Sequence, residues 1–151
     1  MCMKLTPEYA SAQESMKPGR ITAEGFLGDD DRNIADIIAA DEEEFAHLNL
    51  DFSEVAKLLR QLLREGAKGL GNAVVFEKWE ITVDEARGNI PCPFKDGMFS
   101  KRVATIRNLN NSKQIVISDL SVHLLEKHHF LQGKGSIFRL EPSIIRAVLY
   151  E

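Results

Sequence analysis

One cysteine and three histidines in the second half of the chain are the residues best suited to metal chemistry. Cys92 stands between two prolines, His123 and His128 are five positions apart, and His129 follows directly. Thiolate sulfur and imidazole nitrogen are ligands that zinc and related transition metals prefer. A metal site built from Cys92, His123 and His128 is therefore one hypothesis, and it would make the protein a metalloprotein or an enzyme.

Residues 92–129 resemble part of a two-Cys two-His zinc finger, because a predicted hairpin precedes a helix whose His123 and His128 have finger spacing. A finger also supplies a second thiolate two to four residues from the first, and Cys92 has no such partner. Five residues along a helix rotate a side chain by about 140°, so the two histidines are expected to diverge unless the helix end is distorted. We predict His128 near the apolar side of its helix and His129 in solvent. We therefore prefer a structural role for all four side chains and predict no cofactor.

Nucleophilic catalysis by Cys92 is a further hypothesis. It would need a base such as His123, or a helix N-terminus, to lower the pKa of the thiol. Cys92 lies instead in an extended, proline-flanked segment, where a small, buried, apolar cysteine is the usual outcome. No catalytic residue is predicted, and we interpret the protein as a non-enzymatic binding or interaction module rather than an enzyme.

The charge of the chain is divided unevenly. The net charge is −4, but residues 1–85 hold 9 Lys/Arg against 18 Asp/Glu, whereas residues 86–151 hold 10 against 5. The basic half favours an anionic partner: a small anionic ligand, nucleic acid or an acidic protein surface. Complementary patches would also permit a homo-oligomer. The alternative is that the acidic helices and the basic sheet face each other or water. The surplus of Lys and Arg in residues 86–151 is smaller than is usual in a domain that binds nucleic acid.

The loop Gly133-Lys134-Gly135-Ser136 is the best local candidate for an anion site. Glycines let backbone N–H groups approach an anion, and a lysine adds charge. The order of residues is not that of a P-loop, and a helix C-cap glycine followed by a flexible connection explains the loop equally well. With a basic hairpin, this loop forms the predicted contact surface. Its proposed anion-binding residues are Lys101, Arg102, Arg107, Lys134 and Arg139.

Length and composition indicate one globular domain. The chain has 151 residues, of which 44% are hydrophobic and 28% charged, as in ordinary soluble proteins. The apolar runs are too short to cross a membrane, and the first 20 residues do not have the apolar core of a signal peptide. Two cysteines cannot form a disulfide framework, so a reducing, cytoplasmic location is predicted.

The first part of the chain is predicted to be helical after an N-terminal arm. Residues 1–28 show no sustained period and are expected to be a loosely ordered arm, tied down through Ile21, Phe26 and Leu27. A helix is predicted over 31–48, beginning at an aspartate cluster. Asp41 falls on its apolar face. It is either a buried, partnered acid or the start of a second segment after a break, and we favour the break.

A second helix begins at Asp51, with Glu54 as its capping partner, and carries a continuous apolar stripe that ends before a run of glycines. Strands follow over 73–83, with a break near Glu77, and 84–89 is predicted to be a turn. Residues 90–94 are expected to be extended because of the two prolines. A β-hairpin is predicted over 103–117 with its turn at 108–113.

The remaining elements are two helices separated by a loop and a strand. Ser118 or Asp119 is expected to cap a helix over 120–130, residues 137–140 are predicted to be a short strand, and Pro142 begins the last helix. The fold class is therefore α+β, within a single domain at 29–151. An N-terminal helical pair packs on an antiparallel sheet of three to five strands, with two further helices.

Overall fold

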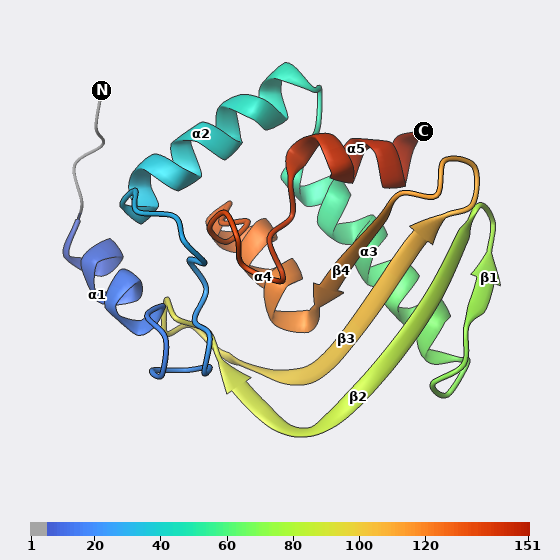
Figure 1. Cartoon of the computed structure of the whole chain (residues 1–151), viewed down its shortest axis with the longest axis horizontal. Helices are drawn as coiled ribbons and strands as arrows, with labels where there is room; N and C mark the ends of the chain where they lie inside the picture. The colour runs from blue at the N-terminus through green and yellow to red at the C-terminus, as the bar shows by residue number, and fades with distance from the viewer. Residues whose placement is uncertain (1–5) are drawn as a thin grey trace.

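The computed structural model describes residues 6–151 and contains, within that range, five helices and four strands (Figure 1). The strands form one antiparallel sheet in the order β1-β2-β3-β4. Helices precede the sheet and two more follow it, which confirms the predicted α+β class. No helix in this range is long and apolar enough to span a membrane. The elements are α1 (Pro7–Ser15), α2 (Ile34–His47), α3 (Phe52–Ala67), β1 (Val74–Phe76), β2 (Trp79–Pro91), β3 (Met98–Asn108), β4 (Gln114–Ser118), α4 (Asp119–His128) and α5 (Pro142–Tyr150).

The sheet presents an apolar face to the helices and a polar face to solvent. Ile81 and Val83 on β2 are buried, as are Ala104 and Ile106 on β3, whereas the residues between them are partly exposed. This period of two is the mark of an antiparallel sheet covered on one side. The helices α3, α4 and α5 contact the sheet on that side (Figure 1).

The pairing of β2 with β3 extends well beyond the rest of the sheet. It runs from Trp79 opposite Asn108 to Pro91 opposite Met98, with a shift in register between Ala86 and Asn89. The predicted turn at 84–89 is therefore wrong. These residues continue β2, and their polar, glycine-containing sequence forms a bulge rather than a reversal of the chain.

Two clusters of buried apolar side chains make up the core. The main core joins the sheet to α3, α5 and one residue of α2. Its largest fully buried side chains are Phe45, Leu59, Leu62, Leu63, Ile81, Ile106 and Ile117, and Trp79 is also a member. The second core joins α1, the start of α2, the end of β2 and α4. Its members are Ala12, Met16, Phe26, Ile34, Ile37, Ile38, Cys92, Leu120, Leu124 and Phe130.

The predicted N-terminal arm contains a helix that the apolar period did not indicate. Thr6 caps α1 by accepting a hydrogen bond from the Tyr9 amide, and Met16 is fully buried. Phe26 is buried, and the other two predicted anchors pack against the second core. Residues 1–5 of the arm lie outside the described residues, and the proposed boundary at 28/29 remains a prediction.

Asp41 does not break α2. The helix is continuous over Ile34–His47. Asn33 caps its N-terminus, and the Asn33 side chain accepts a hydrogen bond from the Asp36 amide. Asp41 is 4% exposed and pairs with Arg139. The favoured prediction of a break is thus wrong, because a cation distant in sequence neutralises the carboxylate and allows it to stay on the buried face.

Most other helix boundaries follow the predicted caps. Asp51 caps α3, Ser118 caps α4, and Pro142 is the first residue of α5. Helix α4 ends at His128, two residues earlier than predicted, because His129 adopts a left-handed conformation. The predicted strand at 137–140 is wrong: this segment is irregular, and Arg139 is bonded by its side chain to Asp41 and Glu141 instead.

Candidate metal centre

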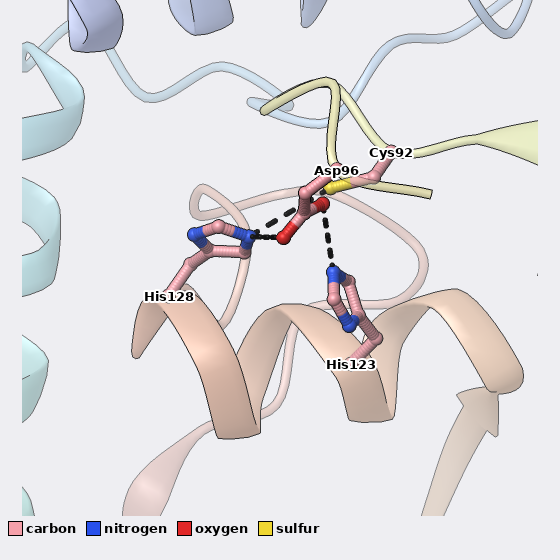
Figure 2. Close-up of side chains that lie close together, drawn as sticks. All are labelled: Cys92, Asp96, His123 and His128. Carbon is pink, nitrogen blue, oxygen red and sulfur yellow. Dashed lines mark hydrogen bonds and ion pairs between the residues drawn. The ribbon is translucent and has the colours of Figure 1, made fainter. Parts of the chain in front are cut away.

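The loop between β2 and β3 places two potential metal ligands side by side. The Cys92 amide donates to the Gly97 carbonyl at 3.0 Å, and the Lys95 amide donates to the Cys92 carbonyl at 2.9 Å. This tight turn, with Lys95 in the left-handed region, orients Cys92 Sγ and the Asp96 carboxylate toward α4 (Figure 2). The Phe94 amide also donates to Cys92 Sγ at 3.4 Å, so the sulfur is held in place by its own loop.

Helix α4 directs two imidazoles at this loop (Figure 2). The centroids of the His123 and His128 rings lie 5.3 Å apart. His128 stacks on Phe94 with ring centroids 4.0 Å apart, and His123 packs against Phe99 in a tilted arrangement with centroids 4.3 Å apart. The expected divergence of the two histidines is therefore wrong. Helical rotation separates their Cα–Cβ bonds, but Asp96 lies between them, and both rings turn inward to reach it.

The four side chains converge on a small volume. Asp96 accepts a hydrogen bond from each histidine, at 2.9 Å from His123 Nε2 to Oδ1 and at 2.7 Å from His128 Nε2 to Oδ2. Cys92 Sγ lies 3.9 Å from His128 Nε2. One ligand atom from each of the four residues lies within 4.8 Å of all the others. The structure thus unites the three predicted metal-binding residues and adds a carboxylate.

Burial and mutual hydrogen bonding determine the charges of this cluster. Burial, together with the adjacent Asp96, raises the pKa of the Cys92 thiol to about 12. Burial acts to raise the pKa of Asp96 as well, but hydrogen bonds from Cys92 and the two histidines outweigh it and hold that pKa below its ordinary value. Burial lowers the pKa of His128, which Asp96 opposes. The lowered pKa keeps Asp96 ionised at neutral pH, and an ionised carboxylate is the form that binds a metal ion.

The spacing of the donor atoms fits a tetrahedral ion. With bonds of about 2.3 Å to sulfur and about 2.0–2.2 Å to nitrogen and oxygen, neighbouring ligands of zinc lie about 3.3–3.7 Å apart. The sulfur–nitrogen distance of 3.9 Å is close to this value. The two nitrogen–oxygen distances are shorter because they are hydrogen bonds. The Asp96 side chain is 38% exposed, so it has room to withdraw by the roughly half an ångström that an ion needs.

Asp96 is the site residue that sequence reasoning missed. A lone carboxylate in a loop is not distinctive, and the weak signal was the Asp-Gly pair four residues after a proline-flanked cysteine. Such a pair is typical of a tight turn. A turn at 95–97 implies that Asp96 lies next to Cys92, and that implication requires only the local sequence. His129, in contrast, lies outside the cluster, pairs with Glu42 and stacks on Phe52.

The predicted anion-binding residues do not gather on one surface. Arg102 is paired with Asp119 at 3.0 Å, and Arg139 is 7% exposed and paired with Asp41. Lys101 lies in the first half of β3 and Arg107 near its end, so that about 20 Å of extended strand separates them. Arg107 also has Glu80 as a neighbour at 4.0 Å.

The chain supplies its own anion to the loop at 133–136. The Lys134 amide donates to Asp30 Oδ2 at 3.2 Å, and the Lys134 carbonyl accepts from the Asp29 amide at 3.0 Å. A Cβ on Gly135 would overlap the Asp29 carboxylate, so the glycine allows this close approach. The loop therefore uses the anion-binding chemistry of glycine-flanked amides internally.

Replacing Asp30 by asparagine is expected to destabilise the protein by about 1–2 kcal/mol at neutral pH. Hydrogen bonds from Arg32 lower the pKa of Asp30 to about 2, against the opposing effect of burial. Because the folded pKa is depressed, this contribution is complete above the ordinary value and disappears as the pH falls through 2. Urea titrations of both proteins between pH 7 and pH 2 should show the difference shrinking below pH 5. A difference that stays constant would contradict the assignment.

Neither the family models, nor the curated proteins, nor the solved structures with which this chain was compared give a match. The function therefore rests on the arrangement of Cys92, Asp96, His123 and His128.

Proposed function

We propose that this protein is a zinc-binding module whose single metal ion is held by Cys92, Asp96, His123 and His128. The observation that carries the proposal is the convergence of four donor atoms within 4.8 Å from two separate segments of chain. One sulfur, two imidazole nitrogens and one carboxylate oxygen form a mixed set that suits zinc, since Mg²⁺ and Ca²⁺ prefer oxygen alone.

The proposed role of the ion is structural. A site with four protein ligands leaves no open position for a substrate, whereas catalytic zinc usually has three. The ion would tie the β2–β3 loop to α4 and so close the second core, of which Cys92 is a member. A non-enzymatic module in a reducing cytoplasm is consistent with this role, because Cys92 must stay reduced to bind a metal ion as its thiolate. The separation of the predicted cations, described above, does not favour a nucleic-acid surface.

The decisive experiment is to measure metal content and binding in tag-free protein. Native mass spectrometry with elemental analysis should find one zinc per chain, and the chelator-stripped protein should take up one equivalent again. Cys92→Ser and His128→Ala should each reduce affinity at least tenfold, since each removes one of four ligands. His129→Ala is the matched control, because His129 is adjacent in sequence but points to Glu42, and it should bind zinc normally.

Cobalt gives an independent view of the same ligands. Co²⁺ in the stripped protein should show visible bands of a tetrahedral ion together with a thiolate charge-transfer band, and Cys92→Ser should abolish the latter. Stripped protein that takes up neither zinc nor cobalt would rule out the site. Uptake that survives both Cys92→Ser and His128→Ala would place the metal elsewhere. Iron instead of zinc in the purified protein would support the proposed ligands and show that the bound metal is iron.

A further inference from the structure

A cavity of about 450 Å³ lies beside the bend of the β2–β3 ribbon, and its lining residues do not include those of the loop at 92–97. Its walls come from four parts of the chain: the segment after α1, the paired second half of β2 and first half of β3, the start of α4, and the irregular segment before α5. The volume lies within the range of small-molecule sites. The lining residues used below are Phe26, Ile90, Lys101, Leu120, Gln132 and Ile137.

The cavity is predominantly apolar. Phe26 and Leu120 are members of the second core, and Ile90 packs against it. Ile137, at 68% exposure, is one of the most exposed large apolar side chains in the described range. An apolar cavity with an exposed apolar side chain among its lining residues gains free energy when a hydrocarbon body displaces the water within it.

The hydroxyl groups in the cavity wall are already engaged. Thr22 Oγ1 accepts from the Gly25 amide, Ser100 Oγ donates to Asp119, and Ser118 Oγ accepts from the Ser121 amide. Each of these bonds fixes a backbone turn or a helix end rather than facing the cavity. These hydroxyls carry no charge, so the charge that would select an anionic ligand must come from another side chain.

Gln132 is a buried donor whose amide nitrogen is unused. The residue is 3% exposed, its Oε1 accepts from Ser136 Oγ at 2.6 Å, and its carbonyl oxygen accepts from Arg139 at 2.9 Å. Within residues 6–151 its Nε2 has no hydrogen-bond partner, and this atom is accessible to solvent. Because this nitrogen reaches solvent, an acceptor in the cavity would replace water as its hydrogen-bond partner.

Lys101 supplies a positive charge to the same cavity. It is exposed, and in the described part of the chain it has no acidic partner within ion-pair distance. Glu24 also lines the cavity, from an exposed loop position. One ammonium and one amide donor, with a carboxylate nearby, favour a ligand that bears a single negative charge over a doubly charged phosphate.

We propose that this cavity binds a small monocarboxylate with an apolar body, such as a medium-chain fatty acid. Its hydrocarbon part occupies the space between Phe26, Ile90 and Leu120, and its carboxylate accepts hydrogen bonds from Lys101 Nζ and Gln132 Nε2. The site is separate from the proposed metal centre and does not depend on it.

Calorimetric titration with octanoate tests the assignment, with octanol and acetate as comparison ligands. Octanoate should bind with one-to-one stoichiometry, octanol at least fivefold more weakly, and acetate not measurably. Lys101→Gln should weaken octanoate at least fivefold and leave octanol unchanged. Lys113→Gln is the matched control, since this exposed lysine lies in the β3–β4 turn away from the cavity. Ala86→Trp, which fills the cavity from an exposed strand position, should abolish binding of both ligands.

A carboxylate can also coordinate a metal ion, so the titration is repeated on metal-free Cys92→Ser protein. Binding that persists there separates this proposal from the zinc site, and binding that disappears with the metal would overturn it. Nitrogen–proton NMR spectra should show the Gln132 side-chain amide among the resonances shifted by octanoate. Equal affinity for octanoate and octanol, or no binding of either, would also overturn the assignment.

Discussion

Arg139→Met is expected to lower the free energy of unfolding by about 3–5 kcal/mol. The Arg139 guanidinium bonds both Asp41 oxygens, at 2.5 and 2.8 Å, and the two side chains are 7% and 6% exposed. Removing the cation would leave the Asp41 carboxylate buried without a partner, which costs far more than the intact pair contributes. Urea denaturation followed by the fluorescence of Trp79, the single tryptophan, would measure the loss.

Two further variants separate charge burial from simple loss of packing. Asp41→Leu combined with Arg139→Met replaces the pair by apolar side chains of similar size, and such replacements are often neutral or stabilising. The double variant should therefore recover most of the stability that the single variant loses. Arg146→Met is the matched control, since Arg146 is more exposed and should cost less than about 1 kcal/mol. A single variant within about 1 kcal/mol of the parent would mean that Asp41 finds another partner.

Zinc is expected to raise the free energy of unfolding by about 4 kcal/mol when free zinc is about 1,000-fold above the dissociation constant. The proposed site exists only when the β2–β3 loop meets α4, so the free energy of zinc binding would add to the free energy of folding. For a domain of this length, the corresponding rise in melting temperature is about 10 °C. Thermal denaturation of stripped protein, with and without zinc, would measure it.

The variants defined for metal binding serve as controls for this effect. Cys92→Ser should lose most of the zinc-dependent shift, and His129→Ala should retain it. The stability of each variant without zinc needs to be measured first, because Cys92 is buried in the second core. An equal shift in the parent and in Cys92→Ser would show that zinc stabilises the protein through other residues.

The parts of the fold that the sequence predicted are those determined by local chemistry. The apolar stripe of α3, its Asp51 cap, the Ser118 cap and the proline at the start of α5 each act within a few residues. Local signals of this kind survive in the folded protein when packing agrees with them. The predicted hairpin was confirmed for the same reason, since its asparagine-rich turn specifies where the chain reverses.

The errors arose where distant contacts override local preference. Asp41 looked like a helix break because its partner, Arg139, is 98 residues away. The segment at 84–89 looked like a turn because its residues are polar, yet pairing with β3 extends the strand through it. Helix α1 has a weak apolar period because only a few of its side chains are buried.

The cluster proposed to bind metal was only partly foreseen, for a similar reason. Residue type singled out Cys92, His123 and His128. The rotation between positions 123 and 128 predicts that their side chains diverge, but it takes no account of how far an imidazole side chain can reach. The missing fourth ligand came from a turn that brings Asp96 next to Cys92. Residue type therefore identified the candidates, and tertiary structure decided which of them meet.

The order of the strands bears on how the chain reaches its native state. Each strand of the sheet pairs with its neighbour in sequence, and α4 follows the last strand directly. Once the loop at 92–97 has closed, each further pair of residues along β2 and β3 is expected to add at little extra entropic cost. Such local connectivity is associated with rapid folding. All four proposed ligands fall within residues 92–128, so the binding site can assemble from one continuous stretch of a growing polypeptide.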